Sequence, residues 1–396
     1  MNTHRPDCSL IIPTRNRAAI LRDTLSRLSN LPDDAFEILV VDNGSFDETP
    51  TLAEDFPHIR WIALGDNLGC AARNVGAVAA RSDILLMLDD DSWPHPGTIE
   101  RLVRLLRERR DLGAVACRVK LADASHRHDA GGVPGTFFNC GGAIRRSAFL
   151  ECGGYPIDFD YYVEEYDLSC RLWKAGWTIE PRGDLLITHR RVTQNRDNNR
   201  MLHFLVRNNL LLWDRYAPND LRDDLIHSTL ERYLRVAIKE NALSGFDEGR
   251  REGHHRINSR KSRRAPLTRA EFAELFGLSA ARAALKRWAD NARIKKIAVW
   301  TRGKSCELLI DLLASINIRV DAVHDAVADE PAWRRVPLKS FTDFNPANVD
   351  GVVVGSLSPG VAEDLADELS TKWPGLPVLS PAPWRGVESP REICAV

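Results

Sequence analysis

Short apolar runs alternate with helical patterns through the first half of the chain. The apolar runs, which predict strands, are Cys8–Pro13, Phe36–Val41, Arg60–Leu64 and Asp83–Leu88. The helical patterns between them cover Ala18–Leu28, Thr49–Asp55 and Cys70–Ala80. Strands this apolar are typical of a parallel sheet that helices cover on both faces, because neither face tolerates water. The first half is therefore expected to be an α/β domain with a mostly parallel sheet.

The pattern changes after Pro218. Helices are predicted at about Leu221–Leu243, and a basic stretch at Arg250–Arg264 is expected to be a solvated loop. A short helix near Arg269–Phe276 has a capping signal, because Thr268 is followed three residues later by Glu271.

A second α/β pattern begins near residue 294. Its predicted strands are Lys296–Trp300, Arg319–His324, Val349–Val354 and Leu376–Leu379. Helical patterns lie between them, which is typical of a small Rossmann-like domain. We therefore predict three parts, which are a first domain at 1–218, a helical and basic linker region at 219–290, and a Rossmann-like α/β domain at 291–396.

Composition narrows the class of protein. Lys and Arg number 54 against 55 Asp and Glu, a formal net charge of −1, so the chain lacks the overall basic character of a nucleic-acid-binding protein. No apolar run approaches the roughly 20 residues of a membrane-spanning helix. The eight cysteines form no CxxC pair, and the polar N-terminus does not resemble a secretory signal. A cytoplasmic protein is expected.

Polar residues collect where three predicted strands end, at Thr14–Asn16, Asp42–Ser45 and Asp89–Asp91. Ligands of open α/β sheets bind beyond the carboxyl ends of the strands. The three consecutive aspartates have two interpretations. They are either a strand end whose last residues cap the next helix, or a site for a hard cation such as Mg²⁺ or Mn²⁺.

Four ordered motifs decide between these interpretations. Ile12–Arg17 reads Ile-Pro-Thr-Arg-Asn-Arg, and Val41–Thr49 reads Val-Asp-Asn-Gly-Ser-Phe-Asp-Glu-Thr. Asn67–Gly76 reads Asn-Leu-Gly-Cys-Ala-Ala-Arg-Asn-Val-Gly, and Asp89–Asp91 supplies an Asp-x-Asp element. In this order the motifs resemble those of the family 2 glycosyltransferases. The resemblance continues to about Pro218 and implies an A-type nucleotide-diphospho-sugar fold.

The resemblance implies a role for residues in each motif. The residues expected to bind the nucleotide are Pro13, Thr14, Arg15, Asp42, Asn67, Arg73, Asp89 and Asp90. A divalent metal, Mn²⁺ or Mg²⁺, is expected on Asp89, Asp91 and His189, because the family often has a histidine after the apolar strand that ends in Ile187-Thr188. The acceptor and sugar pocket is expected at Trp93, Gly141, Gly142 and Arg207.

A second acidic cluster, Glu164, Glu165 and Asp167, precedes a helical pattern that ends at Gly176. Acids in a first helical turn are favoured by the helix dipole alone. The resemblance adds a catalytic role, since one carboxylate of this motif removes the proton of the acceptor in inverting family members. Glu165 stands where the family usually has Asp, so the base is open among Glu165, which is preferred, Asp167 and Glu164.

The resemblance implies an inverting, metal-dependent hexosyltransferase of polysaccharide or cell-envelope synthesis. The expected donor is a UDP- or dTDP-sugar, and the acceptor is a glycan or a lipid-linked hydroxyl. The alternatives are a non-catalytic nucleotide-sugar-binding scaffold or sensor and a sugar-phosphate nucleotidyltransferase. Contact with the inner face of a membrane through Arg250–Arg264 is a further expectation.

Overall fold

The computed structural model describes residues 5–29, 31, 35–123, 125, 127–129, 131–192, 197–259, 264–382 and 384–386. The chain forms two compact units. Unit 1 comprises Met1–Ala124 and Thr136–Phe272, and unit 2 comprises Ser125–Gly135 and Ala273–Val396. The region predicted as a linker is therefore divided between the units, and a short segment from the first half of the chain is part of unit 2.

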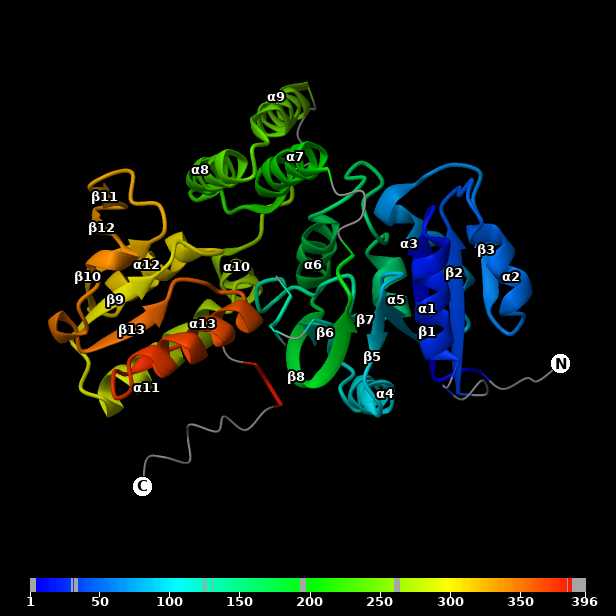
Figure 1. Ribbon diagram of the computed structural model, residues 1–396, viewed down its shortest axis with the longest axis horizontal. Coiled ribbons are helices and arrows are strands. Elements are labelled where there is room, and N and C mark those ends of the chain that lie inside the picture. The colour runs from blue at the N-terminus through cyan, green and yellow to red at the C-terminus, as the bar shows by residue number, and fades with distance from the viewer. Residues whose placement is uncertain are drawn as a thin grey trace. The chain divides into compact units, whose positions relative to one another are not determined.

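Unit 1 is built on a mostly parallel, eight-stranded sheet in the order β3-β2-β1-β4-β7-β6-β8-β5 (Figure 1). The strands are β1 Cys8–Thr14, β2 Phe36–Asp42, β3 Arg60–Ala63, β4 Ile84–Met87, β5 Ser92–Pro94, β6 Leu112–Leu121, β7 Gly142–Arg145 and β8 Thr178–His189. Strand β7 is antiparallel to β4 and β6, and β5 is antiparallel to β8. The predicted fold class, an α/β protein with a mostly parallel sheet, is confirmed.

Both faces of this sheet are buried, as the apolar strands predicted. In β1, Leu10 and Ile12 pack with helices α1 (Ala18–Leu28) and α4 (Thr98–Glu108). Ile11 points to the other face, because side chains alternate along a strand. There it packs with α3 (Ala72–Ala79), α5 (Arg146–Glu151) and α6 (Glu164–Lys174). The short helix α2 (Leu52–Asp55) follows a 3₁₀ turn at Thr49–Thr51.

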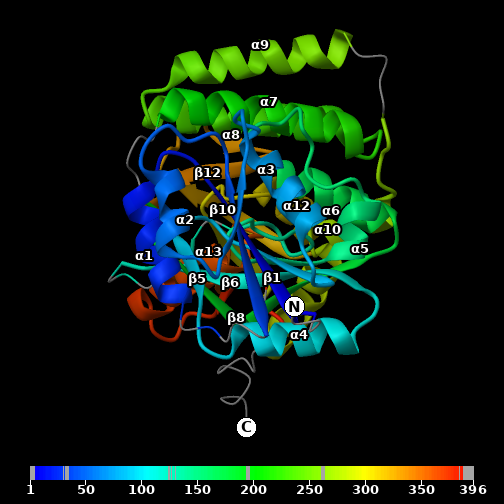
Figure 2. The ribbon, with the colours of Figure 1, turned by 90° about the vertical axis from the view of Figure 1, so that its right-hand side faces the viewer.

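Three further helices of unit 1 follow the sheet: α7 (Asn198–Tyr216), α8 (Arg222–Lys239) and α9 (Leu243–Ser259). Figure 2 shows α9 lying along α7. Most of the stretch predicted as a basic loop is therefore helical, and that prediction was wrong for residues 250–259. Residues 260–263 of the same stretch lie outside the described residues.

Glycines explain why this helix was missed. Gly245, Gly249 and Gly253 recur every four residues and therefore lie on one face of α9. A Cβ atom at Gly245 would meet the carbonyl oxygen of Asn199 at 2.0 Å, and one at Gly249 would meet that of His203 at 2.4 Å. The absent side chains thus let α9 approach the backbone of α7, and a search for apolar periodicity does not detect such a face.

The basic residues of α9 have acidic partners nearby. Arg250 pairs with Asp247 at 3.3 Å, and Arg256 pairs with Glu252 at 2.5 Å. In the part of the chain that the structure describes, no helix combines the length and the apolar composition needed to span a bilayer.

Unit 2 contains a second sheet, in the order β11-β12-β10-β9-β13-β14. Its strands are β9 Lys296–Trp300, β10 Arg319–Asp325, β11 Ala332–Trp333, β12 Val336–Ser340, β13 Gly351–Val354 and β14 Val378–Leu379. Its helices are α11 (Leu278–Asn291), α12 (Cys306–Ser315) and α13 (Pro359–Lys372). All its pairings are parallel except that of β11 with β12. The predicted second α/β sheet is confirmed.

The short helix α10 (Arg269–Leu275) begins as predicted. The backbone N–H of Thr268 donates to Glu271 at 2.6 Å, and the N–H of Glu271 donates to the Thr268 hydroxyl at 3.2 Å. These reciprocal bonds form a capping box.

The segment 125–135 belongs to unit 2 through contacts with α13 and the β9–α12 turn. The His128 backbone N–H and Nδ1 both lie 2.7 Å from the carboxylate of Asp364. The Gly131 carbonyl accepts from Lys304 at 2.9 Å and from Ser358 at 3.2 Å. These contacts explain why residues 125–135 belong to unit 2.

Candidate active site

The first group of polar residues lies at the carboxyl ends of β1 and β2. Thr14 is opposite Asp42 in the parallel pairing, so the two residues end neighbouring strands at the same edge. The Asp42 carboxylate accepts from the backbone N–H of Ser45 at 3.0 Å. The Thr14 hydroxyl donates to Asp90 at 2.8 Å and connects this group to the aspartates that follow β4.

The three consecutive aspartates have different environments. Asp90 is buried and pairs with Arg17 at 2.7 Å. Burial raises its pKa to about 7, against the opposing charge of Arg17. Asp90 therefore faces the interior of the protein and fixes the strand end.

Asp91 is also buried, with its carboxylate between His189 at 3.1 Å and the backbone N–H of Val192 at 3.0 Å. Arg17 lies 3.1 Å from the same carboxylate. Burial alone would raise the pKa of Asp91, but the hydrogen bond and charge of His189 outweigh it and hold the pKa at about 2. Asp91 is thus ionised at neutral pH.

Asp89 is the most exposed of the three carboxylates, at 32% of its side chain. It pairs with the buried guanidinium of Arg73, which lies in α3. Among the described residues, Arg73 Nε has no hydrogen-bond partner. An unused donor on a buried cation is unusual, because buried polar groups are generally paired. Because this nitrogen is buried from solvent, a ligand cannot reach it in this structure.

Asp89, Cys140 and His189 form a cluster that is suited to a metal ion. One ligand atom of each residue lies within 4.8 Å of the others. His189 ends β8 and pairs with Ser92 of β5, so the sheet brings residues 89 and 189 together. His189 Nε2 is 3.9 Å from Asp89 and 3.1 Å from Asp91. The three predicted metal ligands, Asp89, Asp91 and His189, are therefore neighbours.

Cys140 is the residue of this cluster that sequence reasoning missed. It is buried beside the start of β7, about fifty residues in sequence from both Asp89 and His189. Cysteines in apolar segments are commonly buried core residues, so the sequence alone did not indicate that Cys140 is near a metal site. The available signal was its position directly before Gly141 and Gly142, which were predicted to line the acceptor and sugar pocket.

The second acidic cluster opens helix α6, and all three carboxylates are buried. Glu164 accepts from the amide of Asn139 at 2.5 Å. Burial, together with the charge of Glu165, raises the pKa of Glu164 to about 8. The raised pKa favours the protonated form of Glu164, which relieves the repulsion between Glu164 and Glu165.

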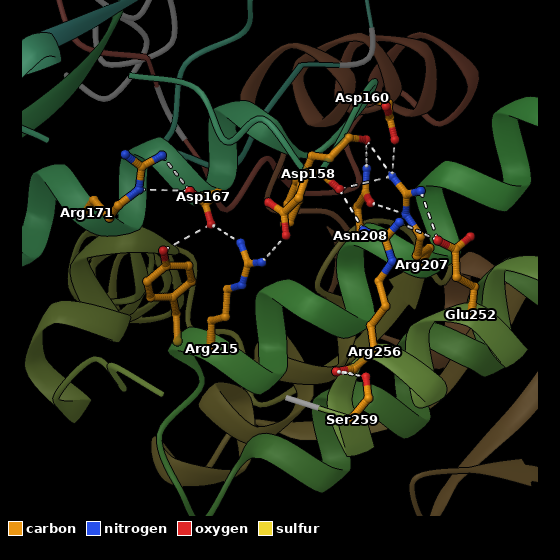
Figure 3. Close-up of polar contacts among 12 residues, drawn as sticks. Asp158, Asp160, Asp167, Arg171, Arg207, Asn208, Arg215, Glu252, Arg256 and Ser259 are labelled. Atoms are coloured by element: carbon orange, nitrogen blue, oxygen red, sulfur yellow. Dashed lines mark hydrogen bonds and ion pairs between the residues drawn. The ribbon is translucent and has the colours of Figure 1, made fainter. Parts of the chain in front are cut away.

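Asp167 has a different environment, which Figure 3 shows. Its carboxylate accepts from Arg171 at 2.8 Å, from Arg215 at 3.1 Å and from the hydroxyl of Tyr216 at 3.0 Å. It is 1% exposed. Two guanidinium groups neutralise it, so Asp167 ties α6 to α7 and is poorly suited to accept a further proton.

Arg73 lies between the two acidic clusters. Its charge interacts with those of Asp89 and Glu164, and Glu164 in turn interacts with Glu165 and Asp89. The fold therefore places Arg73, Asp89 and the two glutamates close enough for their charges to interact. The guanidinium of Arg73 therefore lies near Asp89, which follows β4, and near Glu164 in the first turn of α6.

The other residues predicted to bind the nucleotide or to line the sugar pocket have contacts of their own, outside the two acidic clusters. Trp93 packs against the core, with the guanidinium of Arg27 at 4.4 Å over its ring. Asn67 accepts from the Tyr161 hydroxyl at 3.1 Å, and Arg15 lies 5.9 Å from the ring of Phe46. Pro13 is opposite Val41 in the sheet.

The pocket residues Gly141, Gly142 and Arg207 lie in tightly packed surroundings. A Cβ at Gly141 would meet Val119 at 3.1 Å, and one at Gly142 would meet Phe137 at 2.5 Å. Arg207 is buried in α7 and donates to the carbonyl of Phe159 at 2.8 Å. These contacts support neighbouring backbone.

The pKa of Glu164 has a consequence for stability. A carboxyl whose pKa rises on folding stabilises the fold below its unfolded value, near 4.5, and this contribution is lost as pH rises through about 8. Glu164→Gln removes the titration. We expect its melting temperature to match that of the native chain near pH 4, to exceed it increasingly as the pH rises from about 5 to about 8, and to keep a constant excess above that, as measured by thermal unfolding. A difference that does not vary with pH would contradict the raised pKa.

Comparisons with known proteins find similarity over part of the chain. Residues 9–147 match the family described as Glycosyl transferase family 2. The putative glycosyltransferase EpsH of Bacillus subtilis (strain 168) is 32% identical over 111 residues, which are 27% of this chain and 32% of that protein. The probable glycosyltransferase YdaM of the same strain is 27% identical over 208 residues, 44% of this chain and 48% of YdaM. The matches thus span about a third of the length of EpsH and about half of that of YdaM.

Two solved structures have similar chains. A mannosyltransferase, PcManGT from Pyrobaculum calidifontis in complex with GDP-Man and Mn²⁺, is 19% identical with a TM-score of 0.44. The match covers 66% of this chain and 89% of that one. S. aureus TarS 1–349 in complex with UDP-GlcNAc is 16% identical with a TM-score of 0.43, covering 58% of this chain and 72% of TarS 1–349.

Proposed function

We propose that this chain is an inverting glycosyltransferase that moves a sugar from a nucleoside diphosphate donor to a hydroxyl group of a glycan or lipid-linked acceptor. The observation that carries the proposal is the convergence of two acidic clusters on Arg73. One cluster contains ligands for a cation, and the other contains a carboxylate suited to remove a proton. The family match over residues 9–147 supports the same reaction class.

The donor would bind at the carboxyl ends of β1, β2 and β4. Asp42 lies at this edge, and its carboxylate would accept from a base or a ribose. Arg73, which pairs with the partly exposed Asp89, would place its positive charge beside the diphosphate. Charge grows on the diphosphate as its bond to the sugar breaks, so a fixed guanidinium stabilises the transition state more than the ground state.

The residues of the cation cluster fit a divalent metal. Asp89 supplies a carboxylate oxygen, His189 an imidazole nitrogen and Cys140 a sulfur, and their ligand atoms are mutually within 4.8 Å. Carboxylate and imidazole suit Mn²⁺, while a thiolate shifts the preference towards softer ions such as Co²⁺ and Zn²⁺. A bound divalent cation would supply positive charge against the leaving diphosphate. Asp91, held in place by Arg17 and Val192, lies 3.1 Å from His189 Nε2. It would orient the ring for a metal bound to Nδ1, and it would itself be a ligand for a metal bound at the Nε2 side.

Glu165 would act as the base that takes the proton of the acceptor hydroxyl. Glu164 holds its own proton near neutral pH, and Asp167 is neutralised by Arg171 and Arg215. Glu165 is therefore the carboxylate of the three best suited to accept a proton. The acceptor oxygen would attack the anomeric carbon on the face opposite the nucleoside diphosphate. Its bond to that carbon forms as the bond to the departing diphosphate breaks, which gives inversion.

The direct test is transfer from a panel of UDP-, dTDP- and GDP-sugars with Mn²⁺, using mixed hydroxyl acceptors and mass spectrometry. We expect transfer or slow hydrolysis from one donor class, and NMR of the product should show an inverted anomeric centre. Binding of a nucleotide sugar without transfer or hydrolysis would indicate a scaffold or sensor instead. Release of pyrophosphate from a sugar phosphate and a nucleoside triphosphate would indicate a nucleotidyltransferase.

A further inference from the structure

The loop that leads into α6 has an unusual backbone. Asp160, Tyr162 and Val163 have φ angles of 59°, 67° and 71°. Residues other than glycine rarely adopt this left-handed region, so such a conformation persists only where its surroundings enforce it. Val163 is the residue before the first turn of α6, and Glu164 and Glu165 follow it directly. The loop thus sets the position of both glutamates at the start of α6.

One buried amide holds most of this loop. The Asn208 Nδ2 group in α7 donates to the carbonyl oxygens of Phe159, Tyr161 and Tyr162, each at 2.8 Å. Asn208 is 0% exposed. Figure 3 shows its amide directed at the loop, beside the guanidinium of Arg207.

Arg207 fixes which way the amide points. Its Nε donates to the Asn208 side-chain oxygen at 2.8 Å, so the NH₂ group must face the loop. Arg207 also donates to the carbonyl of Phe159 and pairs with Asp160 at 2.9 Å. A carboxylate at position 208 would place oxygen against three carbonyl oxygens and repel them.

The loop also contacts the Asn67–Gly76 motif, on the side away from α7. The backbone N–H of Cys70 donates to the carbonyl of Asp160 at 2.7 Å. A Cβ at Gly69 would lie 2.3 Å from that same oxygen, and Gly69 itself has a φ of 59°. The loop therefore lies between α7 and the turn that opens the segment of Arg73.

We propose that Asn208 is a positioning residue that sets the orientation of Glu165 by fixing the left-handed loop at residues 158–163. This role rests on the proposed function, because it assigns Glu165 the proton transfer. Asn208 itself touches neither donor nor acceptor. A displacement of about 1 Å at a reacting group can cost about 10²-fold in rate.

The neighbouring residue provides a matched control. Asn209 lies on the same helix, but its amide donates to Leu205 at 2.8 Å and to Tyr233 at 3.3 Å, away from the loop. Asn208→Asp and Asn208→Ala should lower kcat by about 10²-fold while the donor KM changes less than about threefold. Asn209→Ala should leave both constants within about threefold of native, since its contacts do not reach the loop.

Hydrogen exchange of residues 158–167 gives a readout that does not depend on activity. Exchange should accelerate in both Asn208 variants and stay native in Asn209→Ala. Should the Asn208 variants prove insoluble, Gly69→Ala provides a second route, because its Cβ would displace the carbonyl of Asp160 from the opposite side. The same faster exchange and lower kcat are expected.

The outcomes separate the two proposals. Native kcat in a folded Asn208→Asp, or equally fast exchange in Asn209→Ala, would overturn the positioning role and leave the transferase proposal standing. Absence of any sugar transfer by the native chain would overturn the proposed function, and the role assigned to Asn208 would fall with it.

Discussion

Glu165→Gln is expected to lower turnover by about 10²–10⁴-fold, the usual contribution of a general base. The amide keeps the size and most of the hydrogen bonding of the carboxylate but cannot accept the proton of the acceptor hydroxyl. Binding of the nucleotide sugar should stay within about threefold of native, since Glu165 is not placed at the diphosphate end. Steady-state kinetics with the donor identified in the panel, together with calorimetric donor binding, measure the two effects separately.

The other two carboxylates of α6 are the controls for this result. Glu164→Gln reproduces the protonated state that burial already favours, so it should keep most of the turnover. Asp167→Asn leaves Arg171 and Arg215 without their shared carboxylate and should reduce thermal stability first. If Glu165→Gln kept native turnover while Glu164→Gln lost it, the base would be Glu164 and the assignment would have to be reversed.

The polar residues at the strand ends could be predicted from the sequence, because neighbouring parallel strands end at the same edge of the sheet. Asp42 and Asp89 each follow an apolar run, and the carboxyl ends of such strands meet at one edge. His189 was placed by resemblance, and its pairing with Ser92 through β5 and β8 explains why it reaches the aspartates. These residues could be predicted because a regular sheet, rather than individual side chains, brings them together.

The sequence could not predict which of the three carboxylates of α6 is best suited to act as the base. Asp167 pairs with Arg215 and accepts a hydrogen bond from Tyr216, which lie 48 and 49 residues further along the chain. The pKa of Glu164 is raised because the fold buries it beside Glu165. Both effects arise from tertiary packing, and no local pattern encodes them.

Two further features have no periodic signal. Helix α9 packs through the glycines at positions 245, 249 and 253, whereas helix recognition relies on apolar side chains. The loop before α6 contains no glycine at its three left-handed positions, so turn chemistry does not predict its shape. Its conformation is imposed by Asn208, and only the folded chain reveals that partner.

Asp89→Asn is expected to abolish the part of donor binding that depends on a divalent cation. An amide oxygen is a much weaker ligand than a carboxylate, and Asp89 is the least buried of the three aspartates, beside both His189 and Arg73. The affinity for the nucleoside diphosphate should become independent of Mn²⁺ in calorimetric titrations. Asp83→Asn is the matched control, because Asp83 lies near the opposite end of β4 and pairs with Arg5. Unchanged dependence on Mn²⁺ in Asp89→Asn would remove Asp89 from the metal site.

Cys140→Ser separates the two ligand sets that the structure allows. If the sulfur joins Asp89 and His189, Co²⁺ should produce a near-ultraviolet charge-transfer absorption that this variant loses, since a thiolate must bind the metal directly to give it. The variant should also bind Mn²⁺ better relative to Co²⁺ and Zn²⁺, because an oxygen ligand replaces a soft one. If native protein with Co²⁺ lacked that absorption, the site would consist of Asp89, Asp91 and His189 as the sequence predicted. In that case Asp91→Asn should weaken Mn²⁺ binding as strongly as Asp89→Asn, whereas an Asp91 that only orients His189 should cost about 10–100-fold.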